Sequence, residues 1–191
     1  MLGKEKKGQM EMIGLVVIVI LITLGMLFMA IFAFKSESKK KIFTRKGLTY
    51  SAMSAIMKTT VSSDANCAVE YFGKATPQIG AKIVDDCANY PDVEGYSLYR
   101  CKGPISGEQL HSCEFLREMT VYLLNETLGS WNKNYEFQSK LITFQGSEAK
   151  DLIEPIRVNG GCPKWKERDS SGAFPINTEA GLVENVLFLC D

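Results

Sequence analysis

KKGQMEMIGLVVIVILITLGMLFMAIFAF, residues 6–34, joins a short basic leader to a long apolar run. From Met12 to Phe34 the run has 23 residues and no formal charge. A helix rises about 1.5 Å per residue, so this run spans about 34 Å and can cross a hydrocarbon core of about 30 Å. The apolar part of a secretory signal peptide has only about 7–15 residues and leads to a cleavage site with small residues. Here Lys35 follows directly. The sequence therefore predicts a helix that lies in a membrane or in similarly apolar packing.

The size and charge of the rest of the chain restrict its class. The 157 residues that follow the apolar run are enough for one domain with a modest core. Twenty-two basic and 22 acidic residues give a net charge of zero, so no overall attraction to nucleic acid is expected.

The two flanks of the apolar run give conflicting indications of its orientation. Six basic residues lie between Lys35 and Lys46, against three between Lys4 and Lys7, and the positive-inside rule would place the C-terminal side in the cytoplasm. The cysteines favour the opposite orientation, because an even number of them after the apolar run is typical of disulfides in an oxidising exterior. We expect a single-pass protein with a cytoplasmic N-terminus and an exported domain. The six cysteines are Cys67, Cys87, Cys101, Cys113, Cys162 and Cys190.

Disulfides, rather than metal binding, are the expected role of these cysteines. No two of them stand two to four residues apart, so they match no zinc pattern, and we expect no metal and no cofactor. Six cysteines allow 15 connectivities, and the sequence does not choose among them. Short loop closures favour Cys101–Cys113, Cys67–Cys87 and Cys162–Cys190.

The N-terminal helix is expected to continue beyond the apolar run. Residues 36–61 contain no proline and carry one apolar stripe, which predicts an amphipathic extension. The expected organisation is a leader at 1–8, one long helix at 9–62 and an exported head domain at 63–191. The stripe consists of Leu48, Ala52, Ala55, Ile56 and Thr59.

The head is expected to contain two helices followed by strands. Thr76-Pro77 predicts the start of a helix that ends near Asn89, and a second helix is expected from Glu108 to Leu128. Alternation of apolar and polar residues at 135–141 predicts a strand, a second strand is expected at 152–158, and the run 182–190 predicts a last one. This order predicts an α+β fold with a short antiparallel sheet. The faces expected to be buried are Ile79, Ile83, Val84 and Cys87, then Cys113, Leu116, Thr120, Leu123, Leu124 and Leu128, then Tyr135, Phe137, Ser139 and Leu141.

The residues offer little for catalysis, and we expect no enzyme activity. His111 is the one histidine, so any Ser-His-Asp or Cys-His arrangement would have to use it. We expect it on the solvated flank of its helix, where Cys113 two residues on would not face it. No glycine-rich phosphate loop is present.

Two further residues are candidate sites of another kind. Asn125-Glu126-Thr127 is an N-glycosylation sequon, so Asn125 is a candidate modification site in an exported domain. Glu11 lies at the edge of the apolar run, where a carboxylate is costly unless it is neutralised. Glu11 either marks the water boundary of an ordinary anchor or pairs with the α-amino group of a neighbouring subunit.

The N-terminal 34 residues resemble the class III signal peptide of type IV pilins, particularly archaeal ones. The matching features are a basic leader that ends in glycine, a following glutamine, an acidic residue and an apolar helix. The resemblance implies cleavage by a prepilin peptidase between Gly8 and Gln9, with Lys6 and Lys7 in the recognised leader. Glu11 would be the third mature residue, whereas the family's glutamate is usually the fifth, so its role in setting register stays open.

Membership of that family implies a structural role. The apolar helix would wait in membrane lipid until assembly machinery extracts the subunit into a helical surface filament, in which the protein polymerises with itself or serves as a minor subunit. Small residues would then allow close approach of neighbouring helices. The small residues considered for this role are Gly14, Gly25, Ala30 and Ala33.

Three alternatives remain open from the sequence. The chain is an uncleaved single-pass protein whose exported domain binds a ligand or partner, a membrane-tethered enzyme or redox protein, or a protein whose domain faces the cytoplasm. An intact N-terminus would favour the first of these, a reactive free thiol the second, and reduced cysteines the third.

Overall fold

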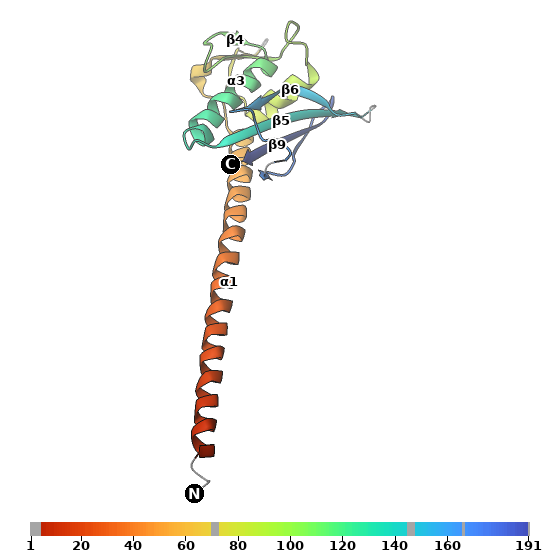
Figure 1. Cartoon of the computed structure of the whole chain (residues 1–191). Helices are drawn as coiled ribbons and strands as arrows, with labels where there is room; N and C mark the ends of the chain where they lie inside the picture. Colours follow the sequence, from red (N-terminus) through yellow and green to blue (C-terminus); the bar gives the residue numbers. More distant parts are fainter. Residues whose placement is uncertain (1–4, 70–72, 145–147, 166, 191) are drawn as a thin grey trace. The chain divides into compact units, whose positions relative to one another are not determined.

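The structure is a computed structural model that describes residues 5–69, 73–144, 148–165 and 167–190, without the side chains of 5–13 and 33–44 (Figure 1). The chain divides into two compact units, Met1–Thr44 and Arg45–Asp191. Helix α1 (Glu5–Lys58) supplies the described part of the first unit and the opening turns of the second. The absence of proline throughout α1 fits its length of 54 residues.

The second unit combines helices with two antiparallel sheets, so the fold is α+β, as the sequence predicts. Its larger sheet has the order β6-β5-β9-β7, and β8 pairs with β9 as well. One sheet was expected from the sequence; the second is built from short strands without an alternating pattern long enough to reveal them. The larger sheet contains β5 (Asn134–Thr143), β6 (Lys150–Arg157), β7 (Arg168–Ser170), β8 (Phe174–Asn177) and β9 (Gly181–Cys190). The smaller sheet, in the order β2-β1-β3-β4, contains β1 (Cys67–Val69), β2 (Gly73–Ala75), β3 (Tyr99–Lys102) and β4 (Gln109–Leu110).

The helices of this unit begin later than the sequence suggests. The helix expected at Thr76-Pro77 starts at Ile79, because Gln78 is extended and forms an antiparallel bridge with Thr60, just after α1. The helix expected from Glu108 starts at Ser112, because residues 109–110 form β4. The described helices after α1 are η1 (Ser63–Ala65), η2 (Ile79–Ile83), α2 (Val84–Asn89), α3 (Ser112–Leu124) and η3 (Asn125–Gly129).

The core of the unit lies between the larger sheet and the helices. In β5 the expected residues Tyr135, Phe137, Ser139 and Leu141 are buried, and Glu136 is buried as well, while buried and half-buried residues alternate along most of β9. Helix α3 lies over this sheet, in contact with β6 (Figure 1). Phe115, which the sequence analysis did not place in the core, is fully buried, whereas Leu123 is only partly buried. The largest fully buried side chains of these elements are Phe115, Leu116, Leu124, Tyr135, Phe137, Leu187 and Leu189.

The buried stripe of α1 is displaced by about one residue from the predicted one. Ile56 is buried as expected, but Ala55 is exposed, and Met53 and Met57 occupy the core. Thr49 is also buried. Its hydroxyl donates to main-chain carbonyl oxygens one turn earlier in the helix, so this polar group is satisfied. The long methionine side chains, which can fill irregular space, therefore face the core, and the alanines lie on the adjoining face.

Arg45, the first residue of the second unit, fastens α1 to the larger sheet. Its Nε lies 2.8 Å from Asp169 Oδ2 in β7, and the side chains are only 14% and 7% exposed. The atoms form an ion pair, although their orientation does not meet hydrogen-bond geometry. Glu167 adds a longer contact, 3.6 Å from Arg45 Nη2. Burial makes this pair sensitive to the loss of either partner.

We expect Arg45→Ala to lower the free energy of unfolding by about 3 kcal/mol, because it leaves the buried Asp169 carboxylate without its counter-ion. The matched control is Lys46→Ala, an exposed neighbour, for which a change below about 0.5 kcal/mol is expected. Urea unfolding of the oxidised protein in detergent measures both. Equal effects of the two variants would contradict the role of the pair.

Candidate functional site

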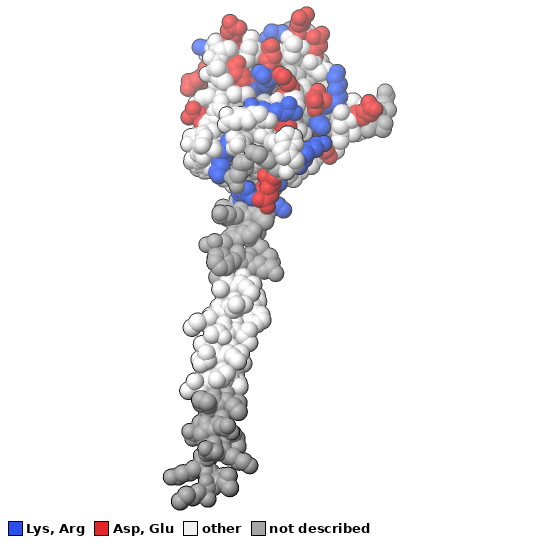
Figure 2. Space-filling model, in the orientation of Figure 1, with Lys and Arg blue, Asp and Glu red and all other residues white. Residues whose placement is uncertain are grey.

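The first candidate site is the apolar stretch of α1 from Gly14 to Phe32. These 19 residues are long and apolar enough to cross a membrane, and none of them is buried. Figure 2 shows this stretch without a charged side chain between the segments drawn in grey. The hydroxyl of Thr23, its one polar side chain, donates to the Ile20 carbonyl oxygen at 2.9 Å. Every side chain of this stretch is therefore compatible with lipid or with packing against other helices.

Two of the small residues considered for assembly share one face of α1. Gly14 and Gly25 are 11 residues apart, which at 3.6 residues per turn leaves them only about 20° apart around the helix. A Cβ atom added at either glycine would meet no atom within 4 Å, so both positions are open surface. Ala30 is exposed but lies about 140° around the helix from Gly25. The described part of the helix therefore presents one glycine face rather than a ring of small residues.

The remaining N-terminal candidates have described backbone only. Lys6, Lys7, Gly8, Gln9 and Glu11 are within α1, and their side chains lie outside the described residues. The same holds for the side chain of Ala33. Their roles in leader recognition, cleavage and assembly stay predictions.

All six cysteines form disulfides. Cys162 pairs with Cys190 as expected, but Cys67 pairs with Cys101 and Cys87 with Cys113. The expectation from short loop closure is wrong for these four cysteines, because β1 pairs with β3 and thereby brings Cys67 opposite Cys101. Cys87 and Cys113 are on α2 and α3, which pack together. Each disulfide therefore joins two elements that the fold already places side by side.

His111 is buried, so the expectation of a solvated histidine is wrong. It precedes α3 and acts as its N-cap: its Nδ1 accepts from the Cys113 N–H at 3.2 Å. Nε2 is therefore the protonated nitrogen, and it donates to the Tyr96 carbonyl oxygen at 3.0 Å. Both ring nitrogens are thus engaged with the main chain, and the histidine joins the start of α3 to the loop before β3.

A serine and an aspartate lie near His111 but are not connected to it as in a catalytic triad. Ser97 Oγ is 2.9 Å from Asp86 Oδ2 and 3.2 Å from Ser112 Oγ. Asp86, almost fully buried, also accepts from the Leu98 and Tyr99 N–H groups at 3.0 Å. Among the described residues no hydroxyl contacts the imidazole, which general-base activation of a nucleophile requires. This network positions the loop between α2 and β3.

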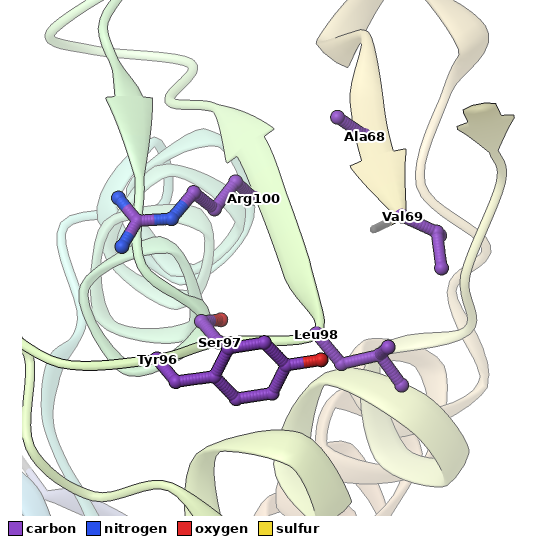
Figure 3. A pocket seen from close by; sticks show the side chains of 6 residues that line it. All are labelled: Ala68, Val69, Tyr96, Ser97, Leu98 and Arg100. Carbon is purple, nitrogen blue, oxygen red and sulfur yellow. The ribbon is translucent and has the colours of Figure 1, made fainter. Parts of the chain in front are cut away.

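That loop lines a hollow of about 410 Å³ beside the smaller sheet (Figure 3). The Tyr96 ring lies between Arg100 and Leu98, and Ala68 and Val69 come from the neighbouring strand β1. Arg100 Nη2 donates to the Gly95 carbonyl oxygen at 3.0 Å, which holds the guanidinium against the loop. The hollow offers apolar contact and one cation.

Asn125, the candidate glycosylation site, is exposed where α3 passes into η3. Its Oδ1 accepts from the buried Tyr135 hydroxyl at 2.6 Å. The amide nitrogen, which would carry a glycan, is the atom that this hydrogen bond leaves available. Burial raises the pKa of Tyr135, so this hydroxyl remains a donor at neutral pH.

Glu136 is a buried carboxylate that joins three segments of the head. Its Oε1 accepts from Gln138 Nε2 at 2.8 Å and from Arg157 Nε at 3.2 Å, and its Oε2 accepts from the Cys162 N–H at 3.2 Å. Burial acts to raise the pKa of Glu136, but these hydrogen bonds and the charge of Arg157 together hold it below its usual value. The carboxylate therefore stabilises the loop that carries the Cys162–Cys190 disulfide.

Several of these anchoring residues were not found from the sequence. Asp86, Arg45 and Glu136 resemble ordinary solvated charges there, because their partners are far away in the chain. Comparisons with protein-family models, with curated proteins and with solved structures gave no match to this chain.

The lowered pKa of Glu136 predicts a pH-dependent contribution to stability. Because the pKa is lower in the folded state, the contribution is present above the unfolded value of about 4.3 and is lost as the pH falls through the folded value. We expect Glu136→Gln to be less stable than the wild type at pH 7, with the difference shrinking toward pH 3. Urea unfolding at pH 7, 5 and 3 measures this. The exposed Glu154→Gln is the control, and an identical pH dependence in both variants would refute the assignment.

Proposed function

We propose that this chain is a structural subunit of a type IV pilus-like surface filament, archaeal in character, which polymerises through α1 after leader cleavage between Gly8 and Gln9. The observation that carries the proposal is the apolar stretch Gly14–Phe32, in which no residue is buried, following a leader of the prepilin kind. Such a stretch needs either lipid or other helices around it. A filament subunit uses both in succession.

The disulfides support the part of the proposal that places the head domain outside the cell. Three disulfides and no free cysteine fit a domain that folds in an oxidising compartment. In this proposal the N-terminus faces the cytoplasm, where the leader is cleaved, and the head lies outside. The head would then coat the filament.

The assembly step follows from the chemistry of the helix surface. In lipid, Gly14 and Gly25 leave two open positions on one face of α1, three turns apart, with Ile18 and Leu21 between them. In a helical bundle, side chains of a neighbouring helix approach the backbone at these glycines, and van der Waals contacts replace those with lipid. Prepilin peptidase and the assembly machinery are the partners that this route requires.

An uncleaved single-pass protein with an exported binding domain is the second candidate. The observation in its favour is the hollow beside Tyr96 and Arg100, which offers apolar surface and a positive charge at once. Processing distinguishes the two candidates, because only the filament subunit loses its leader.

The first experiment is the intact mass of the native protein with and without reductant. We expect the mass of residues 9–191 with three disulfides. Gly8→Trp should abolish the shortening, because a bulky side chain fills the subsite beside the cleaved bond, while Gly3→Trp in the same leader is the control. A full-length native mass would favour the uncleaved candidate, and shortening of the Gly8→Trp protein would contradict cleavage at this bond.

The glycine face gives a separate prediction for assembly. Gly25→Leu keeps the helix apolar, so membrane insertion should be unchanged, but the added side chain holds neighbouring helices apart. We expect at least about tenfold fewer filaments, which corresponds to a loss of about 1.4 kcal/mol in subunit contact. Electron microscopy of surface material and membrane fractionation measure the two effects. Ala30→Leu on another face is the comparison, and normal filaments from Gly25→Leu would contradict close helix approach at Gly25.

A further inference from the structure

The chain has only two tryptophans, and both are exposed. Trp131 is 60% exposed and Trp165 is 86% exposed, although tryptophan has a large apolar surface and a polar N–H group. Neither belongs to the core of the head. Two such side chains in water call for an explanation if they lie near each other in the fold.

Both tryptophans are at the same end of the larger sheet. Trp131 precedes the first residue of β5, Asn134, by three positions, and Trp165 precedes the first residue of β7, Arg168, by three. Asn134 and Arg168 both pair with Cys190, the last residue of β9 that lies between them. The two tryptophan segments therefore flank one strand end.

Both segments are also held in place. The turn at Trp131 is closed by hydrogen bonds from the Asn132 N–H to the Gly129 carbonyl oxygen at 2.8 Å and from the Lys133 N–H to the Leu128 carbonyl oxygen at 3.0 Å. The segment at Trp165 follows Cys162, whose disulfide to Cys190 ties it to β9. The exposed rings are thus presented by constrained backbone.

Basic residues lie near both tryptophans. Lys133 is two residues after Trp131, the exposed Lys164 directly precedes Trp165, and Arg168 lies over the Phe188 ring at 4.4 Å. Of the described carboxylates on the neighbouring strands, Asp169 and Glu136 are buried and paired with arginines, and Glu167 is exposed. Asp191, which follows Cys190, lies outside the described residues. Tryptophan with lysine or arginine is the combination found where proteins meet lipid headgroups.

The number of residues between the apolar run and the head is small enough for this end to reach the membrane. Arg45 pairs with Asp169, which is next to Arg168. Arg45 comes 11 residues after Phe34, the last residue of the apolar run. At about 1.5 Å per residue, a helix of that length spans about 17 Å, and the headgroup layer occupies part of that distance. A tilted helix shortens it further.

We propose that the tryptophan-bearing end of the larger sheet binds the headgroup layer of an anionic membrane while the apolar stretch of α1 is inserted in it. The proposal rests on membrane insertion, which both functions proposed above share. An anionic membrane is a better binding partner for this face than a second copy of the same face, because two copies would bring like charges together. The same lipids would attract the basic residues that follow the apolar run, from Lys35 to Lys46.

The test uses the full chain in vesicles at about one protein per vesicle, with phosphatidylcholine alone or mixed with phosphatidylglycerol. All tryptophan fluorescence reports on the proposed surface, since the chain has no other tryptophan. In the mixed vesicles we expect a blue-shifted emission, at least about twofold weaker quenching by acrylamide, and quenching by lipids with a nitroxide on the headgroup. Trp131→Phe and Trp165→Phe assign the signal to each ring.

Charge variants test the role of the anionic lipid. Lys164→Glu should weaken the dependence on phosphatidylglycerol, whereas Lys150→Glu, at the first residue of β6 and away from the tryptophan end of the sheet, should leave it unchanged. Equal effects of the two variants would overturn the electrostatic part of the proposal.

The possible results distinguish failure of this membrane-binding surface from failure of the proposed filament function. Co-flotation with vesicles while both tryptophans remain fully accessible to acrylamide would overturn the surface and leave the filament proposal intact. Protection that rises only with the protein-to-lipid ratio, without quenching by labelled lipid, would identify a second copy as the occupant and overturn lipid binding. Failure to float with vesicles would overturn membrane insertion and the surface together.

Discussion

The need to cover the apolar stretch of α1 governs the rest of this protein. Fifteen large apolar side chains between Leu15 and Phe32 are about half exposed or more. Burial of such side chains is worth about 1.5–3 kcal/mol each, so the whole stretch represents roughly 20–40 kcal/mol. A domain of the size of the head is stable by only about 5–15 kcal/mol. The apolar stretch therefore carries a larger unmet burial energy than the stability of the head.

Covalent and ionic links within the head supplement its small core. Its three disulfides close loops of 34, 26 and 28 residues, and each closure contributes about 3–4 kcal/mol in the chain-entropy view. Buried carboxylates add specific contacts. Asp86 and Glu136 accept hydrogen bonds from the loop before β3 and the loop at Cys162, and Asp169 forms an ion pair with Arg45 of α1. These contacts link segments that the small core alone would leave loosely attached.

The sequence predicted the long elements of the head better than the short ones. The alternation at residues 135–141 corresponds to β5, because a two-residue period indicates a strand, and the apolar run at 182–190 corresponds to β9. Strands of two to four residues, such as β1 and β4, carry no such period, and the second sheet was missed. The position of His111 was missed for a related reason: β4 delays the start of α3, and the histidine becomes its cap.

The sequence by itself determined the exposed apolar helix, the α+β class and the presence of disulfides, because these depend on local composition, periodicity and the number of cysteines. Only the tertiary structure decided which cysteines pair, which carboxylates are buried, and that Trp131 and Trp165 flank the same strand end. Each of these depends on segments brought together from distant parts of the chain. Strand register determines these long-range contacts, and no local pattern in the sequence predicts them.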